Sequence, residues 1–184
     1  MSAASLKDKI PPHNLEAEQA TLGAILLDWD AVGTAIIHLR AESFYSLQHQ
    51  KIFKSILSLY NKGQRGDVLT LAEDLRQTGQ LDAAGGVAYI ASLPDHVPTS
   101  SNIEYYAQLV KDDYNRRELI KISSLAIADA HDDTKPSRST LEETQNKLFT
   151  LTESDQSQNV ISQEEKAREA EAAAAKEAEK AAEA

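Results

Sequence analysis

Residues 101 to 130 constrain the fold more than any other part of the sequence, because they form a long run without glycine or proline. Apolar residues recur along this run at the three- and four-residue spacing of a helix. About 29 helical residues span roughly 43 Å, whereas a compact domain of about 100 residues has a radius of gyration of about 13 Å. We therefore expect a long helix that projects beyond the body of the protein.

The second half of this run carries more apolar residues than one neighbouring helix can cover. At about 100° per residue they occupy more than half of the circumference, and a helix with one neighbour needs a stripe only about 100° wide. A second helix, predicted from 140 to 152, can fold back over part of this surface, and a dimer partner would cover the rest. The alternative is that the whole surface packs within its own domain. The apolar residues are Leu119, Ile120, Ile122, Leu125, Ala126 and Ile127.

The pattern is helical nearly throughout, so the predicted fold class is all-α: a compact multi-helix globular body followed by a protruding antiparallel helical hairpin. Pro11 and Pro12 stop any preceding helix, and Asn14 is a good N-cap for the helix that follows. The apolar face of this first helix is expected to hold Leu15, Leu22, Ile25, Leu26 and Leu27.

Later helices are marked by their own start and stop signals. Asp30 and Ser46 are expected to begin two helices, and Gly63 is expected to follow the end of the second. Asp67 and Thr70 are interpreted as structural caps. Capping boxes are expected at Thr70 with Glu73, Ser101 with Glu104, and Ser139 with Glu142.

These signals divide the chain into five segments. Residues 1–9 are predicted to be a disordered lead-in, residues 10–98 the globular helical body, and residues 99–153 the helical hairpin. Residues 154–163 are predicted to be a flexible linker. The alanine-, glutamate- and lysine-rich stretch 164–184 is expected to form a solvated helical tail, since it has no leucine, isoleucine or valine for a coiled-coil seam.

Composition excludes several classes of function. The absence of cysteine removes thiolate catalysis and cysteine zinc sites, and favours a cytoplasmic location. A net charge of −10 disfavours a broad nucleic-acid-binding surface. No apolar run approaches the roughly 18 residues of a membrane span, and the lead-in lacks the apolar core of a signal peptide.

The sequence contains no recognisable motif for catalysis or cofactor binding. None of the seven glycines is followed by lysine, so a phosphate-binding P-loop is missing. Asp28, Asp30 and Gly33 match positions of a calcium loop, but Val32 and Leu39 stand where further ligands are required. The five histidines are scattered and none pairs at metal-ligand spacing. We therefore predict no catalytic, cofactor-binding or metal-binding residues.

Four stretches of the sequence carry a family resemblance. They are PPHNLEAEQATLGAILLD, ESFYSLQHQKIF, DVLTLAEDLRQTGQLDAAGGVAYIASL and VPTSSNIEYYAQLVKDDYNRREL. In this order and spacing they resemble the N-terminal domain of the bacterial replicative DNA helicase, the DnaB family, over residues 10 to about 153. The resemblance implies a helical body and a helical hairpin.

The same resemblance implies a non-catalytic collar domain that serves assembly. Hairpins would pair two chains into a homodimer, and three dimers would form a collar on a hexameric ring. The collar would recruit primase through the C-terminal helical domain of primase. The family's motor domain, where ATP and magnesium are expected, is not in this sequence. We therefore expect no ATP hydrolysis or translocation, and little or no direct nucleic-acid binding.

Two other classes of function stay open at this stage. The chain would act as a stand-alone adaptor or inhibitor if it co-assembled with full-length helicase or sequestered primase. It would be an enzyme if a metal or nucleotide caused a large thermal shift, although no motif supports this. For the collar interpretation, the candidates for hairpin packing, dimer contact or primase contact are Tyr105, Tyr106, Leu109, Val110, Tyr114, Leu119, Ile122 and Ala126.

Overall fold

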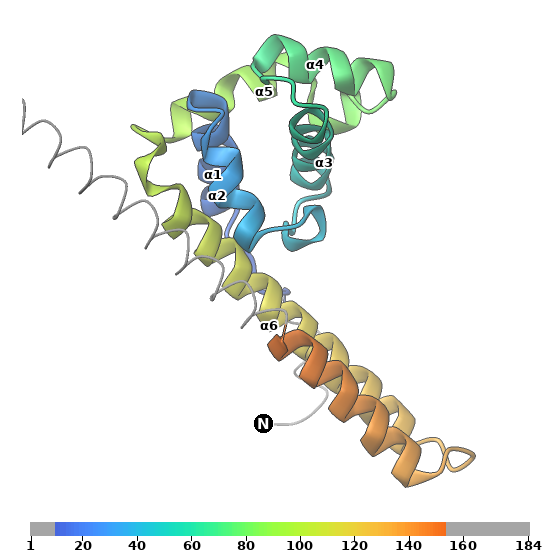
Figure 1. Ribbon diagram of the computed structural model, residues 1–184. Coiled ribbons are helices and arrows are strands. Elements are labelled where there is room, and N and C mark those ends of the chain that lie inside the picture. The colour runs from blue at the N-terminus through green and yellow to red at the C-terminus, as the bar shows by residue number, and fades with distance from the viewer. Residues whose placement is uncertain (1–9, 154–184) are drawn as a thin grey trace, which may run out of the picture. The chain divides into compact units, whose positions relative to one another are not determined.

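The computed structural model describes residues 10–153, and the chain divides into two compact units, residues 1–125 and 126–184 (Figure 1). Every regular element among the described residues is helical, which confirms the all-α fold class. The predicted lead-in, linker and tail lie outside the described residues. The predicted boundaries of body and hairpin stay a prediction.

The first unit is built around helix α1 (Leu15–Leu27). It packs against α2 (Ala31–His38), α3 (Leu47–Asn61) and two short 3₁₀ turns, η4 (Leu93–His96) and η5 (Ser100–Asn102). Figure 1 shows α1 and α2 close together, with α3 next to them on the right. Because it has neighbours on several sides, α1 is the central helix of this unit.

The predicted apolar face of α1 is only partly correct. Leu22 and Ile25 are fully buried, but Leu15 and Leu27 are 42% and 48% exposed. The reason is that small side chains line the rest of the helix and let its neighbours approach on more than one side. The buried small residues are Ala17, Ala20, Thr21, Gly23 and Ala24.

Several other elements of the first unit pack around α3. The helix α4 packs on α3 and on α5, and the turn η3 lies between α3 and α5. Their bounds are η2 Ala41–Ser43, α4 Val68–Gln77, η3 Asp82–Ala84, α5 Gly86–Ser92 and α6 Ile103–Ala130. The predicted long helix, expected to end near Ala130, is therefore confirmed as α6.

Helix caps agree with the sequence at some positions and differ at others. The Asn14 side chain accepts from the Ala17 amide, and Ser46 caps α3. Gly63, at a φ of 67°, follows the end of α3 in the left-handed conformation that glycine tolerates best. Asp30 stands at the N-cap of α2 but makes no side-chain cap bond.

The three predicted capping boxes are wrong in detail. The box at α4 pairs Asp67 with Thr70, because the carboxylate of Asp67 accepts from the Thr70 amide and the Thr70 hydroxyl accepts from the Asp67 amide. Asp67 and Thr70 are therefore caps, as predicted, but Glu73 is not part of the box. Thr99 caps the turn η5 that precedes α6, and its side chain accepts from the Ser101 amide, so Ser101 lies inside this turn and is not its cap. The last helix of the described residues begins at 137, so Ser139 lies inside it.

The second unit contains the end of α6, a turn at 131–136 and a helix from 137 to 153. Lys135 forms an ion pair with Asp129 across the turn, and this bond raises the pKa of Lys135 above its ordinary value. The Asp132 side chain accepts from the amide and hydroxyl of Thr134. None of the helices described is both long and apolar enough to cross a membrane.

Candidate functional site

Helix α6 presents different surfaces to the core and to solvent within the first unit. Ile103, Ala107 and Val110 are buried and belong to the hydrophobic core. Successive residues are about 100° apart on a helix, so Tyr105, Leu119 and Ile120 lie on the opposite side. We call these three residues the outer face of α6.

The outer face is exposed and combines apolar with polar residues, because Gln108 and Asp112 lie on the same side of α6 between Tyr105 and Leu119 and are joined by a hydrogen bond. Tyr105 is 64% exposed, Leu119 49% and Ile120 53%. Single exposed apolar residues are common on protein surfaces, so the adjacent pair Leu119 and Ile120 carries more weight than Tyr105, which lies about 21 Å away along the helix. Arg116 shares this side of the helix and pairs with Asp113, so a charged group accompanies the apolar residues.

The candidate residues predicted from sequence fall into three classes of exposure. Tyr105 and Leu119 are exposed and lie on the outer face. Tyr106 and Leu109 are half-buried and pack against the core, and Tyr114 and Ala126 are half-buried as well. Val110 and Ile122 are buried, at 2% and 8% exposure. Which of these residues meets a partner stays a prediction.

Tyr114 is shielded by its surroundings on α6. Burial raises the pKa of its hydroxyl above the ordinary value of 10.0, and the nearby Glu118 carboxylate adds to the rise. The hydroxyl therefore stays protonated at neutral pH and can serve as a hydrogen-bond donor.

The second unit carries exposed apolar residues of its own. Ile127 at the end of α6 is 57% exposed, and Leu141 and Phe149 on the helix 137–153 are 70% and 60% exposed. The sequence analysis noted Ile120, Leu125 and Ile127 as apolar but did not include them among the candidate contacts. Their position on a helix with few buried residues was the signal that could have added them.

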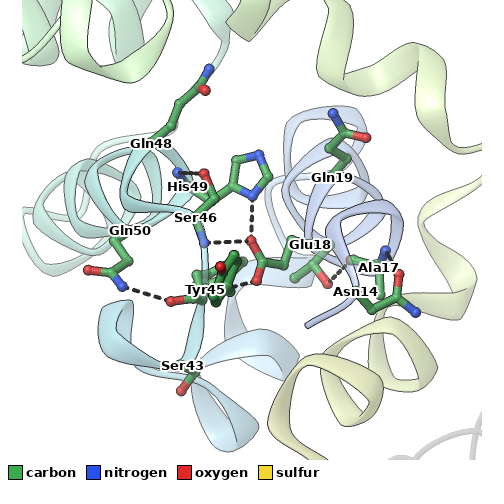
Figure 2. A network of polar contacts seen from close by, with 12 residues as sticks. Asn14, Ala17, Glu18, Gln19, Ser43, Tyr45, Ser46, Gln48, His49 and Gln50 are labelled. Atoms are coloured by element: carbon green, nitrogen blue, oxygen red, sulfur yellow. Dashed lines mark hydrogen bonds and ion pairs between the residues drawn. The ribbon is translucent and has the colours of Figure 1, made fainter. Parts of the chain in front are cut away.

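A buried polar network in the first unit was missed by sequence reasoning (Figure 2). Glu18 of α1 is 1% exposed and accepts three hydrogen bonds. The donors are the backbone amides of Tyr45 at 2.6 Å and Ser46 at 3.3 Å, and the Nδ1 atom of His49 at 2.6 Å. We assign the proton of this last bond to His49, because an ionised carboxylate only accepts.

The network continues from His49 to the edge of the unit. The Nε2 atom of His49 lies 2.6 Å from the Tyr89 hydroxyl of α5, which also accepts from the Gln19 side chain at 3.2 Å. Both oxygens of Glu18 and both ring nitrogens of His49 thus have partners. A saturated network of this kind fixes the positions of α1, α3 and α5 rather than leaving a group free for chemistry.

No described residues form a metal site: no group of three or more histidine, cysteine, aspartate or glutamate side chains in the described part of the chain is arranged to hold a metal ion. In particular, Asp28 accepts from the Asp30 amide in the α1–α2 connection. The geometry of that connection is that of a helix turn.

Comparison with known protein families gives one match that covers more than half of the chain. The family described as the DnaB-like helicase N terminal domain matches residues 10–112. This range contains the whole body up to the first third of α6, including the Glu18 network and Tyr105.

Individual relatives agree with the family match. The replicative DNA helicase DnaB of Treponema pallidum is 50% identical over 147 residues, which is 80% of this chain and 34% of that helicase. The chain thus spans about a third of the length of this relative.

Two solved structures share the fold. The N-terminal domain of DnaB helicase from Mycobacterium tuberculosis has a TM-score of 0.72 and 31% identity, over 77% of this chain and 99% of that one. A DnaB-like replicative helicase, described together with its interactions with primase, has a TM-score of 0.62 and 26% identity, over 75% of this chain and 31% of that one. Sequence and fold together place the chain in the family of DnaB-like helicase N-terminal domains.

Proposed function

We propose that this domain is a non-catalytic assembly module, which pairs with a second copy through α6 and recruits primase to a replicative helicase. One observation carries the proposal: the outer face of α6 exposes Tyr105, Leu119 and Ile120 to solvent. The chain belongs to a family of helicase N-terminal domains, and assembly of a helicase is a process in which such a face would be used.

The energetics favour an occupied outer face. Fully burying a leucine or isoleucine side chain contributes about 1.5–3 kcal/mol. Because Leu119 and Ile120 are already about half buried, a partner that covered both would gain about 1.5–3 kcal/mol in total before the cost of association is subtracted. Two copies of one helix face can meet around a two-fold axis, which makes a symmetric homodimer the simplest occupant, and a trimer of dimers the next level of assembly.

Primase is proposed as the second partner, through its C-terminal helical domain. The support is the similarity to a DnaB-like helicase described together with its interactions with primase. An apolar helix face with a charged residue beside it suits docking of another helix. We propose a cytoplasmic location for the same assembly, and no direct role in nucleic-acid binding, in agreement with the net charge of −10.

The test is the molar mass of the chain in solution, measured by light scattering over a range of micromolar concentrations. The expected mass is twice the 20.2 kDa of one chain, or a higher multiple of two. Adding the C-terminal domain of primase should give a larger complex. A single-chain mass at every concentration, together with no complex, would contradict the proposal.

Mixing the chain with full-length helicase separates this function from that of an inhibitor. An assembly module should leave the unwinding rate of the helicase unchanged at equal concentrations. Loss of unwinding in proportion to the added chain would favour the alternative of an adaptor or inhibitor that co-assembles with helicase or sequesters primase.

A further inference from the structure

Arg117 on α6 joins two irregular segments of the first unit through one guanidinium group. Its Nη1 donates to the Pro12 carbonyl at 2.9 Å, and its Nη2 donates to the Ser43 carbonyl at 2.6 Å. These acceptors are 105 and 74 residues away in sequence. One side chain therefore ties the entry to α1 and the connector before α3 to the same turn of α6.

Aromatic rings surround this guanidinium. Its central carbon lies 5.7 Å from the ring centroid of Tyr45 and 5.9 Å from that of Tyr114, both within the range of cation–π attraction. The His13 ring stacks on Tyr45 with centroids 4.4 Å apart. Tyr45 thus stands between Arg117 and His13, and a change at Arg117 is transmitted to His13 through both Pro12 and Tyr45.

The segment formed by residues 11–13, which we call the strap, has few other attachments. Its contacts with the described part of the chain are the Pro12 carbonyl bond to Arg117, the His13 stack on Tyr45, and a bond within the strap between His13 Nδ1 and the Pro11 carbonyl. Proline has no backbone N–H, so two of the three strap residues cannot donate to a helix or turn. The preceding Ile10 is 75% exposed and adds no anchor.

The connector on the other side of Arg117 is held differently. Phe44 is 1% exposed and packs at 4.9 Å from Phe53, and the Tyr45 and Ser46 amides are fixed by Glu18. This side is therefore part of the core. The strap is the less firmly attached of the two segments, and Arg117 joins it to the core-packed connector.

We propose that Arg117 is a conformational latch, which holds the strap closed on α6 and Tyr45 so that the strap opens or closes independently of the hydrophobic core. Lysine cannot replace this role fully, because a guanidinium offers a planar fork to two carbonyls and stacks on rings, whereas an ammonium is a point charge. The latch goes beyond assembly through the outer face, since Arg117 lies on the side of α6 that meets the body.

The test is nitrogen-15 NMR relaxation on the full chain and its variants. In the native chain the backbone order parameter at His13 should be about 0.85, as in a rigid helix. In Arg117→Met, which keeps an aliphatic stem but removes the donors and the charge, it should fall below about 0.6. Arg117→Lys should lie between these values. The order parameters of α4 (Val68–Gln77) should not change in any variant.

The matched control is Arg116→Met, one residue away, because Arg116 is exposed and pairs with Asp113 on its own helix. It should leave His13 rigid. If Arg117→Met fails to fold, Tyr45→Leu removes the ring between His13 and the guanidinium and should loosen the strap in the same way. The latch is refuted if His13 stays rigid in the variant tested, or if α4 loosens together with the strap.

Discussion

Helices α1 and α6 differ in how much of their surface is buried. Eight of the 13 residues of α1 are buried, whereas only five of the 28 residues of α6 are. Composition explains part of the difference, because nine of the 28 residues of α6 are charged and only two of the 13 residues of α1 are. The contacts of α1 are completed inside the first unit, and those of α6 are not. Under the proposed function, α6 is the helix that a partner would cover.

The largest effect on stability is expected when the buried carboxylate of α1, Glu18, is removed. Glu18→Ala leaves the His49 ring and the Tyr45 and Ser46 amides without their buried acceptor. Each buried donor left without an acceptor costs about 1–3 kcal/mol, so with three donors affected the free energy of unfolding in urea should fall by about 3–5 kcal/mol. Glu18→Gln is the milder control, because it keeps one acceptor oxygen. A loss below about 1 kcal/mol for the alanine variant would show that α1 is not fixed by this network.

A smaller effect is expected where α1 approaches the backbone of another element. A Cβ atom at Gly23 would lie 2.3 Å from the Leu93 carbonyl oxygen, which cannot move without shifting η4. Gly23→Ala should therefore cost about 1–3 kcal/mol in thermal or urea unfolding. The matched control is Gly33→Ala in α2, where the nearest atom, the Tyr60 hydroxyl, is 3.7 Å away. This variant should gain up to about 1 kcal/mol from helix propensity. Equal effects at the two glycines would contradict the close packing of α1.

The exposed N-cap of α4 should have an effect on stability that is smaller than the effects in α1 and larger than those on the outer face of α6. Asp67→Ala removes the acceptor of the Thr70 amide and should cost about 1 kcal/mol at neutral pH. The Thr70 amide, and then its hydroxyl, lower the pKa of Asp67 below its ordinary value of 3.8. The ionised cap therefore stabilises the native chain above pH 3.8, and this contribution disappears as the pH falls through the lowered pKa. The difference in unfolding free energy between native chain and variant should shrink below about pH 3.8. A difference independent of pH would contradict the assigned role.

Local signals predicted the helices well because they act within a few residues. Asn14 and Ser46 were identified as caps because a short polar side chain directly before an apolar run is enough to indicate the start of a helix. The α4 box was misassigned at Glu73, because Asp67 three residues before Thr70 offers a stronger acceptor to the same amide. A sequence motif alone does not show whether Asp67 or Glu73 accepts from the Thr70 amide.

Burial could not be predicted in the same way. Glu18 has the sequence position of a first-turn acid, which favours the helix dipole and is usually exposed. Its burial depends on the Tyr45 amide and the His49 ring, 27 and 31 residues away. Arg117 lies among acidic residues of α6, yet its acceptors are the carbonyls of Pro12 and Ser43. The partners of both side chains come from distant segments, which local sequence patterns do not reveal.

The outer face of α6 should give the smallest effect on stability. Ile122 is a poor position for such a test, since at 8% exposure a charge there would disturb the fold. Leu119→Asp combined with Ile120→Asp alters exposed positions and should change the free energy of unfolding of the isolated chain by less than about 0.5 kcal/mol per site. Leu69→Asp on α4, which is 75% exposed, is the matched control for the added charge.

The molar mass of this double variant tests the central claim most directly, namely that the outer face of α6 is an interface. Measured by light scattering beside the native chain and Leu69→Asp, the double variant should have the mass of one chain, 20.2 kDa, while the other two keep twice that mass or more. We expect its dissociation constant to rise at least about 100-fold, which corresponds to about 2.8 kcal/mol. A double variant that keeps its helicity and the mass of the native assembly would contradict the claim.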